Sequence, residues 1–167
     1  MSTTPTTHVV VGVVLGQPPA VVRTAATFAR RFGAELVCAC VDPARYTLEH
    51  AVDGPDLAVP LDPDLLDPPV AEPDPRVEAM VAEHLRGTEV PWRYRALAGG
   101  PARELARLAE ELDAAMIVVG TREAGLRGSL RELVNGSVAA QLAHRQHRPV
   151  VVVPLAPSAD DEDPSPA

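Results

Sequence analysis

Five short runs of apolar, largely β-branched residues predict five β-strands. Together they lack the strict apolar–polar alternation of a half-exposed strand. This lack of alternation is typical of strands covered on both faces, as in a parallel sheet. The runs are Val9–Leu15, Ala34–Val41, Val90–Leu97, Met116–Gly120 and Val150–Val153.

The segments between these runs repeat apolar residues at the spacing of one helix face, and prolines or glycines mark several of their ends. These predicted helices span Pro18–Phe32, Asp74–Leu85, Pro101–Leu112 and Gly136–His147. Strands and helices therefore alternate, which predicts right-handed crossovers. The expected fold class is α/β: a doubly wound, five-stranded parallel sheet with strand order 3-2-1-4-5 and helices on both faces.

A long stretch between the second strand and the second helix interrupts the alternation. Residues 43–75 contain eight prolines and eight acidic residues against a single arginine, Arg45. This composition has no apolar periodicity with which to pack a core. We therefore expect one domain over residues 8–155 with an acidic, proline-rich insert at 43–73, and disordered ends at 1–7 and 156–167.

The formal net charge of −8 is unevenly distributed along the chain. Residues 43–75 carry −7 and residues 157–167 carry −4, which leaves +3 for the remainder. The overall acidity argues against a nucleic-acid partner. The mildly basic remainder is compatible with a small anionic ligand.

All 15 basic side chains are arginine, and the absence of lysine excludes several classes of protein. P-loop NTPases, protein kinases and Schiff-base or pyridoxal-phosphate enzymes each need a lysine ammonium at the reacting centre. Cys38 and Cys40 would share one face of a strand, which is typical of free thiols in a reducing compartment. No apolar run reaches ten residues, so we expect a cytoplasmic protein without membrane contact.

Ligands of open α/β sheets bind at the carboxyl ends of the strands, where the strand order reverses. In the predicted order this point is bordered by Val13–Gln17 and by the segment that follows Gly120. The second segment contains several glycines and arginines and ends at Gly136 and Ser137, where helix N–H groups and a hydroxyl suit a phosphate. The alternative is structural: the glycines shape a turn, and Asn135 or Ser137 caps the helix.

Several segments occur in an order and at a spacing that are specific when taken together. They are Val9–Val13, Phe32–Leu36, Gly100–Ala102, Ala115–Arg122, Gly136–Val138 and His147–Pro154. Through them the chain resembles the universal stress protein family over roughly residues 8–42 and 74–155. This family consists of small α/β domains that are often homodimers, and many members bind ATP or AMP. The lysine-free, arginine-rich composition further suggests a GC-rich genome, such as that of an actinobacterium.

The resemblance implies ATP or AMP as the candidate ligand, and the candidate binding residues combine positions of the family's site with arginines of the loop after Gly120. These residues are Val14, Val41, Gly120, Arg122, Arg127, Gly136, Ser137 and Val138.

The chain departs from the family's nucleotide-binding loop. In that loop a first glycine is followed by two residues and a second glycine, and then by nine residues, a third glycine and a serine or threonine. Glu123 stands at the second glycine position, and twelve residues separate it from Gly136. Val14 or Leu15 stands where the family tends to place an aspartate that meets the nucleoside. Arginines of the loop, Arg122, Arg127 and Arg131, have the geometry to bind phosphate instead. We therefore do not expect the family's usual mode of ATP binding to apply unchanged.

The run of four valines between Pro149 and Pro154 predicts a short, flat edge strand with few charges to block pairing. The resemblance implies that this strand pairs with its copy in a second subunit. We favour a twofold homodimer through Val150, Val151, Val152 and Val153 over coverage by the chain's own insert or tail.

Three functions remain open at this stage. The first is a non-catalytic regulatory module in stress response that binds a small ligand, with an adenine nucleotide as a candidate. The second is a protein-interaction module that acts through residues 43–73. The third is a nucleotide hydrolase or transferase, for which Glu123 is the obvious local metal-binding carboxylate. We assign no catalytic residue and no metal site, because neither Cys38 and Cys40 nor His144 and His147 have the ligand number or spacing of one.

Overall fold

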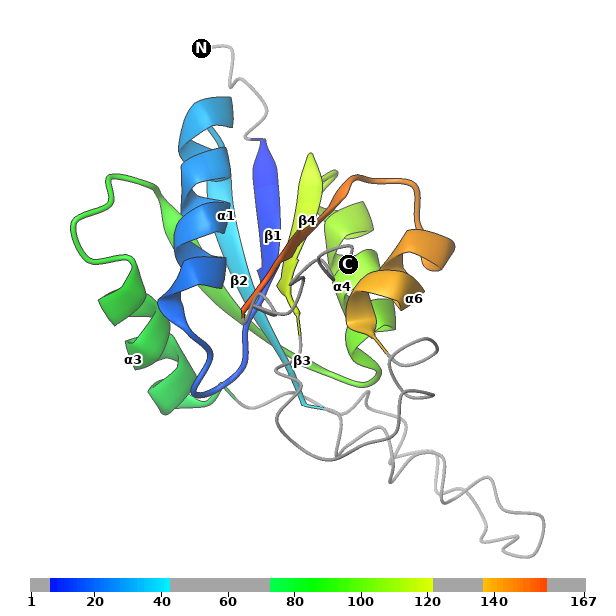
Figure 1. The fold of residues 1–167 in the computed structure, drawn as a ribbon, viewed down its shortest axis with the longest axis horizontal. Coiled ribbons are helices and arrows are strands. Elements are labelled where there is room, and N and C mark those ends of the chain that lie inside the picture. Colours follow the sequence, from blue (N-terminus) through cyan, green and yellow to red (C-terminus); the bar gives the residue numbers. More distant parts are fainter. Residues whose placement is uncertain (1–6, 43–72, 122–136, 156–167) are drawn as a thin grey trace, which may run out of the picture.

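The computed structural model describes residues 7–42, 73–121 and 137–155. These residues form a parallel sheet with strand order β3-β2-β1-β4-β5, flanked by helices (Figure 1). The strands are β1 (His8–Gly12), β2 (Glu35–Asp42), β3 (Trp92–Ala98), β4 (Met116–Gly120) and β5 (Val150–Val153). The helices are α1 (Pro19–Phe32), α3 (Pro75–His84), α4 (Pro101–Glu111) and α6 (Val138–Arg145). The predicted fold class and strand order are therefore confirmed.

The end of β1 is where the predicted elements differ most from the observed ones. The apolar run reaches Leu15, but the strand ends at Gly12. Beyond it the chain turns outward, and the side chains of Val14 and Leu15 are 56% and 49% exposed. The prediction of a longer strand was wrong because apolar side chains in an exposed loop look the same in a sequence as buried ones.

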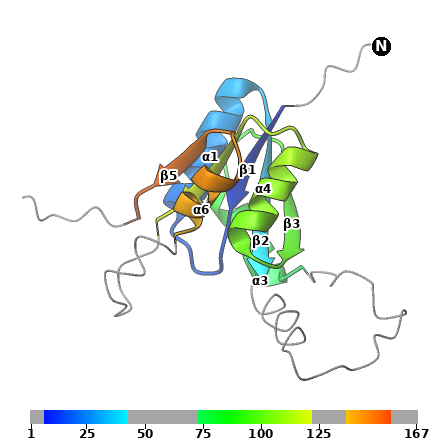
Figure 2. The same ribbon diagram turned by 90° about the vertical axis from the view of Figure 1, so that its right-hand side faces the viewer.

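Side chains of the central strands alternate between the two faces of the sheet, and each face has its own core. Val9 and Val11 pack in one cluster with residues of α1 and α3. Val10 packs in the other cluster with residues of α4 and α6. Figures 1 and 2 show the corresponding layers, with helices on both sides of the sheet. Burial on both faces explains why these strands are apolar throughout.

Local sequence signals set the starts and ends of the helices. Proline occupies the first turn of α1, α3 and α4, where its missing N–H costs no hydrogen bond. Asp74 caps α3 by accepting from the backbone N–H of Arg76 at 2.9 Å. Gly33 ends α1 in the left-handed conformation, with φ of 60°.

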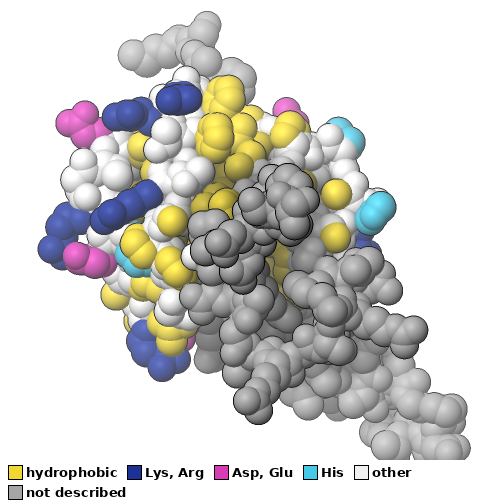
Figure 3. Space-filling view, in the orientation of Figure 1, with side chains coloured by type: hydrophobic (Ala, Val, Ile, Leu, Met, Phe, Trp, Pro, Cys, Tyr) yellow, Lys and Arg dark blue, Asp and Glu magenta, His cyan; other side chains and the backbone are white. Residues whose placement is uncertain are grey.

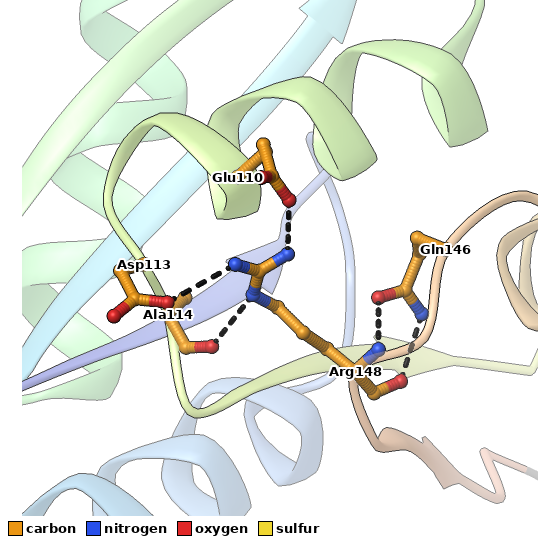
Figure 4. A network of polar contacts seen from close by, with 5 residues as sticks. All are labelled: Glu110, Asp113, Ala114, Gln146 and Arg148. Carbon is orange, nitrogen blue, oxygen red and sulfur yellow. Dashed lines mark hydrogen bonds and ion pairs between the residues drawn. The ribbon is translucent and has the colours of Figure 1, made fainter.

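The start of β5 is held in place by Arg148, whose side chain is only 9% exposed (Figure 4). Its Nε donates to the carbonyl oxygen of Ala114 at 2.9 Å, and its two terminal nitrogens lie 2.6 Å from Glu110 and 3.2 Å from Asp113. The side chain of Gln146 bonds to both backbone polar groups of Arg148. This network joins the edge strand to the connection between α4 and β4.

Both cysteines are free thiols on the same face of β2, as their spacing predicted. Burial raises the pKa of the Cys38 thiol to about 12 and raises the pKa of the half-buried Cys40 thiol as well. Trp92 and Tyr94 of the edge strand β3 pack against the same core. Within the described part of the chain, every helix is too short or too polar to cross a membrane.

Candidate functional site

A cavity of about 360 Å³ lies at the carboxyl ends of β1, β2 and β4, next to the point where the strand order reverses. Its volume is within the range of small-molecule sites, and its position is the one where open α/β sheets bind ligands. It is lined by Gly12, Val13, Val14, Leu15, Gly16, Gln17, Pro18, Ala39, Val41, Pro101, Leu105, Val119, Gly120, Thr121, Val138 and Leu155.

Two glycines at strand ends allow close packing around this cavity. A Cβ atom on Gly120 would lie 2.9 Å from Cγ2 of Val21 and 3.1 Å from Cδ1 of Leu155. A Cβ atom on Gly12 would lie 3.1 Å from Cδ1 of Leu105. All three distances are shorter than ordinary van der Waals contact, so larger residues here would displace the wall of the cavity.

The loop after β1 is fixed by its own backbone. The N–H of Val13 donates to the carbonyl of Ala39 at 2.9 Å, and the N–H of Gln17 donates to the carbonyl of Val14 at 3.2 Å. Gly16 between them has φ of 78°, a conformation that favours glycine. The loop therefore holds apolar side chains at the rim of the cavity and Gln17 in its wall.

Polar side chains are few in the described wall. Thr121 and Gln17 supply a hydroxyl and an amide, and the described part of the lining contains no charged side chain. The hydroxyl of Thr121 accepts from the N–H of Leu155 at 2.9 Å. The Oε1 atom of Gln17, in contrast, is buried and has no hydrogen-bond partner among the described residues.

Helix N-termini converge on the cavity and make its surroundings electropositive. Pro18, Pro101 and Val138, at the starts of α1, α4 and α6, all line it. The positive end of a helix dipole favours an anionic or electron-rich ligand. Glu104 in the first turn of α4 is buried, but its carboxylate lies 2.9 Å from Nε of Arg107 and is therefore compensated.

The residues expected at the site are only partly within the described chain. Val14, Val41, Gly120 and Val138 all line the cavity. Ser137 lies at the start of α6 and caps this helix, because its hydroxyl accepts from the N–H of Ala140 at 3.1 Å. Capping is the structural role that was the alternative to ligand binding for this residue. The other expected site residues lie outside the described chain: Arg122, Arg127 and Gly136, and with them Glu123, Arg131 and Asn135. The same holds for residues 1–6, for positions 43–72 of the insert and for the tail at 156–167.

Sequence reasoning did not single out Gln17 and Leu155. Gln17 lies in the segment that was expected to border the crevice, and it is the polar side chain between Gly16 and Pro18, so a signal was present. Leu155 is held at the cavity by the hydrogen bond from its N–H to the hydroxyl of Thr121. The two residues are 34 positions apart, so no local sequence pattern indicates this contact.

Comparisons with known proteins give a consistent result. A model described as "Universal stress protein family" matches residues 5–154. No curated protein matches the chain. Among solved structures, a universal stress protein from Archaeoglobus fulgidus is 21% identical with a TM-score of 0.60, over 88% of this chain and 98% of that one.

Two further structures were determined with nucleotides. The universal stress protein from Archaeoglobus fulgidus in complex with dAMP is 19% identical, with a TM-score of 0.59 over 90% of this chain and 99% of that one. A family protein from Arabidopsis thaliana with AMP bound is 14% identical, with a TM-score of 0.53 over 96% and 99%. At these identities the structures show the shared fold. Because the family model covers nearly the whole length, this chain belongs to the universal stress protein family.

Proposed function

We propose that this chain is a non-catalytic regulatory module in stress response that binds a small ligand, with ATP or AMP as the first ligands to test. The observation that carries the proposal is the cavity of about 360 Å³ at the point of strand-order reversal. Proteins of the same fold have been solved with dAMP, AMP and cAMP, which supports an adenine nucleotide as the ligand class.

The chemistry of the described wall supports binding rather than catalysis. Its residues include no carboxylate, imidazole or thiol, the groups that transfer protons or hold a metal in nucleotide-cleaving sites. What the described wall offers is apolar surface, one amide, one hydroxyl and the positive ends of helices. Apolar surface can bind the ring of a ligand and helix ends can attract its negative charge, but neither activates a nucleophile.

The proposed ligand contacts follow the sequence expectations. Val14, Val41, Gly120 and Val138 would contact the ligand from the cavity wall, with Ser137 next to them at the start of α6. Arg122, Arg127 and Gly136 are proposed for the phosphates on sequence grounds alone, because they lie outside the described residues.

Titration calorimetry of the full chain with ATP, AMP and cAMP tests this function. We expect saturable binding of at least one of them, and weaker binding in Val41→Phe, whose larger side chain fills part of the cavity. Circular dichroism of the variant controls for folding. Lack of binding of all three nucleotides at millimolar concentration would overturn the proposal. A native mass spectrum adds the mass of any nucleotide that co-purifies.

We further propose a cytoplasmic homodimer formed through β5. Val152 is 44% exposed on this edge strand. On the face that carries β5, hydrophobic side chains form a band through the middle of the view, with arginines toward the rim (Figure 3). An apolar edge of this kind is usually covered in a folded protein.

A further inference from the structure

Gln17 places an unsatisfied amide in the wall of the cavity. Its Oε1 is buried without a hydrogen-bond partner among the described residues, whereas most buried polar atoms in proteins have one. The Nε2 atom of the same amide lies beside Gly120, 3.3 Å from where a Cβ of that residue would be. Val21 and Leu155 approach the same position, so the surroundings of the amide are apolar.

The position of this amide is imposed by the loop rather than by bonds of the side chain itself. The turn from Val14 to Gln17 is closed by a backbone hydrogen bond, and Gly16 supplies the positive φ that it needs. Pro18 and Pro19 follow immediately and restrict the backbone further. A buried amide oxygen without a partner is unfavourable to folding, so a rigid loop that keeps it there points to a use outside the folded chain's own packing.

We propose that Gln17 is a specificity-determining residue of the cavity, whose amide hydrogen-bonds to an uncharged donor–acceptor edge of the ligand. The inference rests on the proposed function, and for an adenine nucleotide the edge is that of the nucleobase. A glutamine amide matches the amino group and ring nitrogen of adenine in two parallel hydrogen bonds. Rotation about the last side-chain torsion, which is soft, brings either amide atom toward the ligand.

The surroundings of Gln17 favour a base over a phosphate at this point. The described neighbours of the amide, Val21 and Leu155, are aliphatic. Moving a neutral ring against such side chains is favourable, whereas a phosphate would lose its hydration beside them. The part of the ligand that Gln17 meets is therefore its neutral ring.

The test compares AMP with purine riboside 5′-monophosphate, which lacks the exocyclic amino group, on the full-length wild type and on Gln17→Leu. We expect the wild type to prefer AMP by about tenfold, the effect of one hydrogen bond. Gln17→Leu, which loses both hydrogen bonds, should bind AMP at least about tenfold more weakly and show no preference between the two. Gln141→Leu, which removes an amide that does not line the cavity, is the matched control and should behave like the wild type.

Thermal unfolding without nucleotide separates recognition from a structural role. Because Gln17→Leu removes an unsatisfied buried atom, its midpoint should equal or exceed that of the wild type. A lower midpoint together with an unchanged preference for AMP would overturn the inference and leave the proposed function intact. If instead the variant loses a preference for AMP over dAMP, Gln17 contacts the sugar and the assignment to the base is wrong. If the wild type binds no nucleotide, the proposed function fails first.

Discussion

The guanidinium of Arg148 donates from Nε to the carbonyl oxygen of Ala114 at 2.9 Å, and it thereby joins the residues that precede β5 and β4. The Arg148 side chain as a whole is 9% exposed, whereas its acidic partners Glu110 and Asp113 are 70% and 98% exposed. The bond to the carbonyl is therefore the part of the network that solvent weakens least (Figure 4).

Replacing Arg148 by Met should lower the free energy of unfolding by about 1–3 kcal/mol, because it leaves the Ala114 carbonyl without its partner. Glu110→Gln and Asp113→Asn, which each remove one exposed charge, should cost less than about 1 kcal/mol. Urea unfolding of the three variants measures the difference. Equal losses in all three would show that the exposed ion pairs carry the stability.

Gly120→Ala should destabilise the fold by about 1–3 kcal/mol and weaken nucleotide binding, because the new methyl group overlaps Val21 and Leu155. Gly12→Ala is the matched comparison at the other strand end. Its methyl group is crowded by the end of the flexible Leu105 side chain and is in ordinary contact with Val119, so its loss should be smaller. Thermal unfolding and calorimetry of both variants test this order, and a reversed order contradicts the packing described here.

Stability should fall in alkali because of Cys38. Burial raises the pKa of its thiol from 9.0 to about 12, so the folded state keeps a proton that the unfolded state loses. This stabilisation is complete below pH 9 and is lost as the pH rises toward 12, at about 1 kcal/mol per pH unit. Cys38→Ala should show a shallower decline in urea unfolding between pH 9 and pH 11. An equal decline of the unfolding free energy with pH in both proteins would refute a role of Cys38.

Stability should also fall in mild acid because of His84. Burial, and next the charge of Arg23, lower the pKa of this imidazole below its usual 6.5, and its Nδ1 is buried without a partner among the described residues. The stabilisation is complete above the usual pKa and is lost as the pH falls below it.

Comparing urea unfolding at pH 7.5 and pH 5.5 checks the role of His84. His84→Gln should lose less stability than the wild type between the two values. His144→Gln, at an exposed position on α6, serves as the control and should follow the wild type. A wild-type-like loss in His84→Gln would assign the acid sensitivity to another group.

Val152→Asp should convert the proposed homodimer into a monomer, because it places a charge on the exposed side of β5. Ala82→Asp on the exposed surface of α3 is the control and should leave the mass unchanged. Native mass spectrometry or light scattering gives the subunit number. A monomeric wild type, or a dimeric Val152→Asp, would refute pairing through this strand.

The order and type of the elements were predictable because each strand is buried on both faces and each helix has one apolar face. The limits of β4 and β5 agree with their apolar runs. The limit of β1 does not, since Gly16 and not apolarity decides where the chain turns. Hydrogen bonds between residues far apart in the sequence, such as that of Arg148 with Ala114, produce no periodic sequence pattern and were not predicted.

The site was predictable in position more than in chemistry. The rule of strand-order reversal directed attention to Val14 and Gly120, and both line the cavity. Whether they bind a nucleotide stays a prediction. Gln17 lies in the segment that this rule selects, but the sequence does not show that its Oε1 is buried without a hydrogen-bond partner among the described residues.

The parallel sheet gives this chain one rim with long connections and one rim with short connections. Residues 43–72 and 122–136 follow β2 and β4, so both long stretches leave from the edge where the cavity opens. At the opposite edge the connections are short, such as Gly33 and Ala34 between α1 and β2. Lengthening a loop costs little free energy once its ends are fixed. Insertions at one rim can therefore change what such a chain recognises while the framework of strands and helices stays the same.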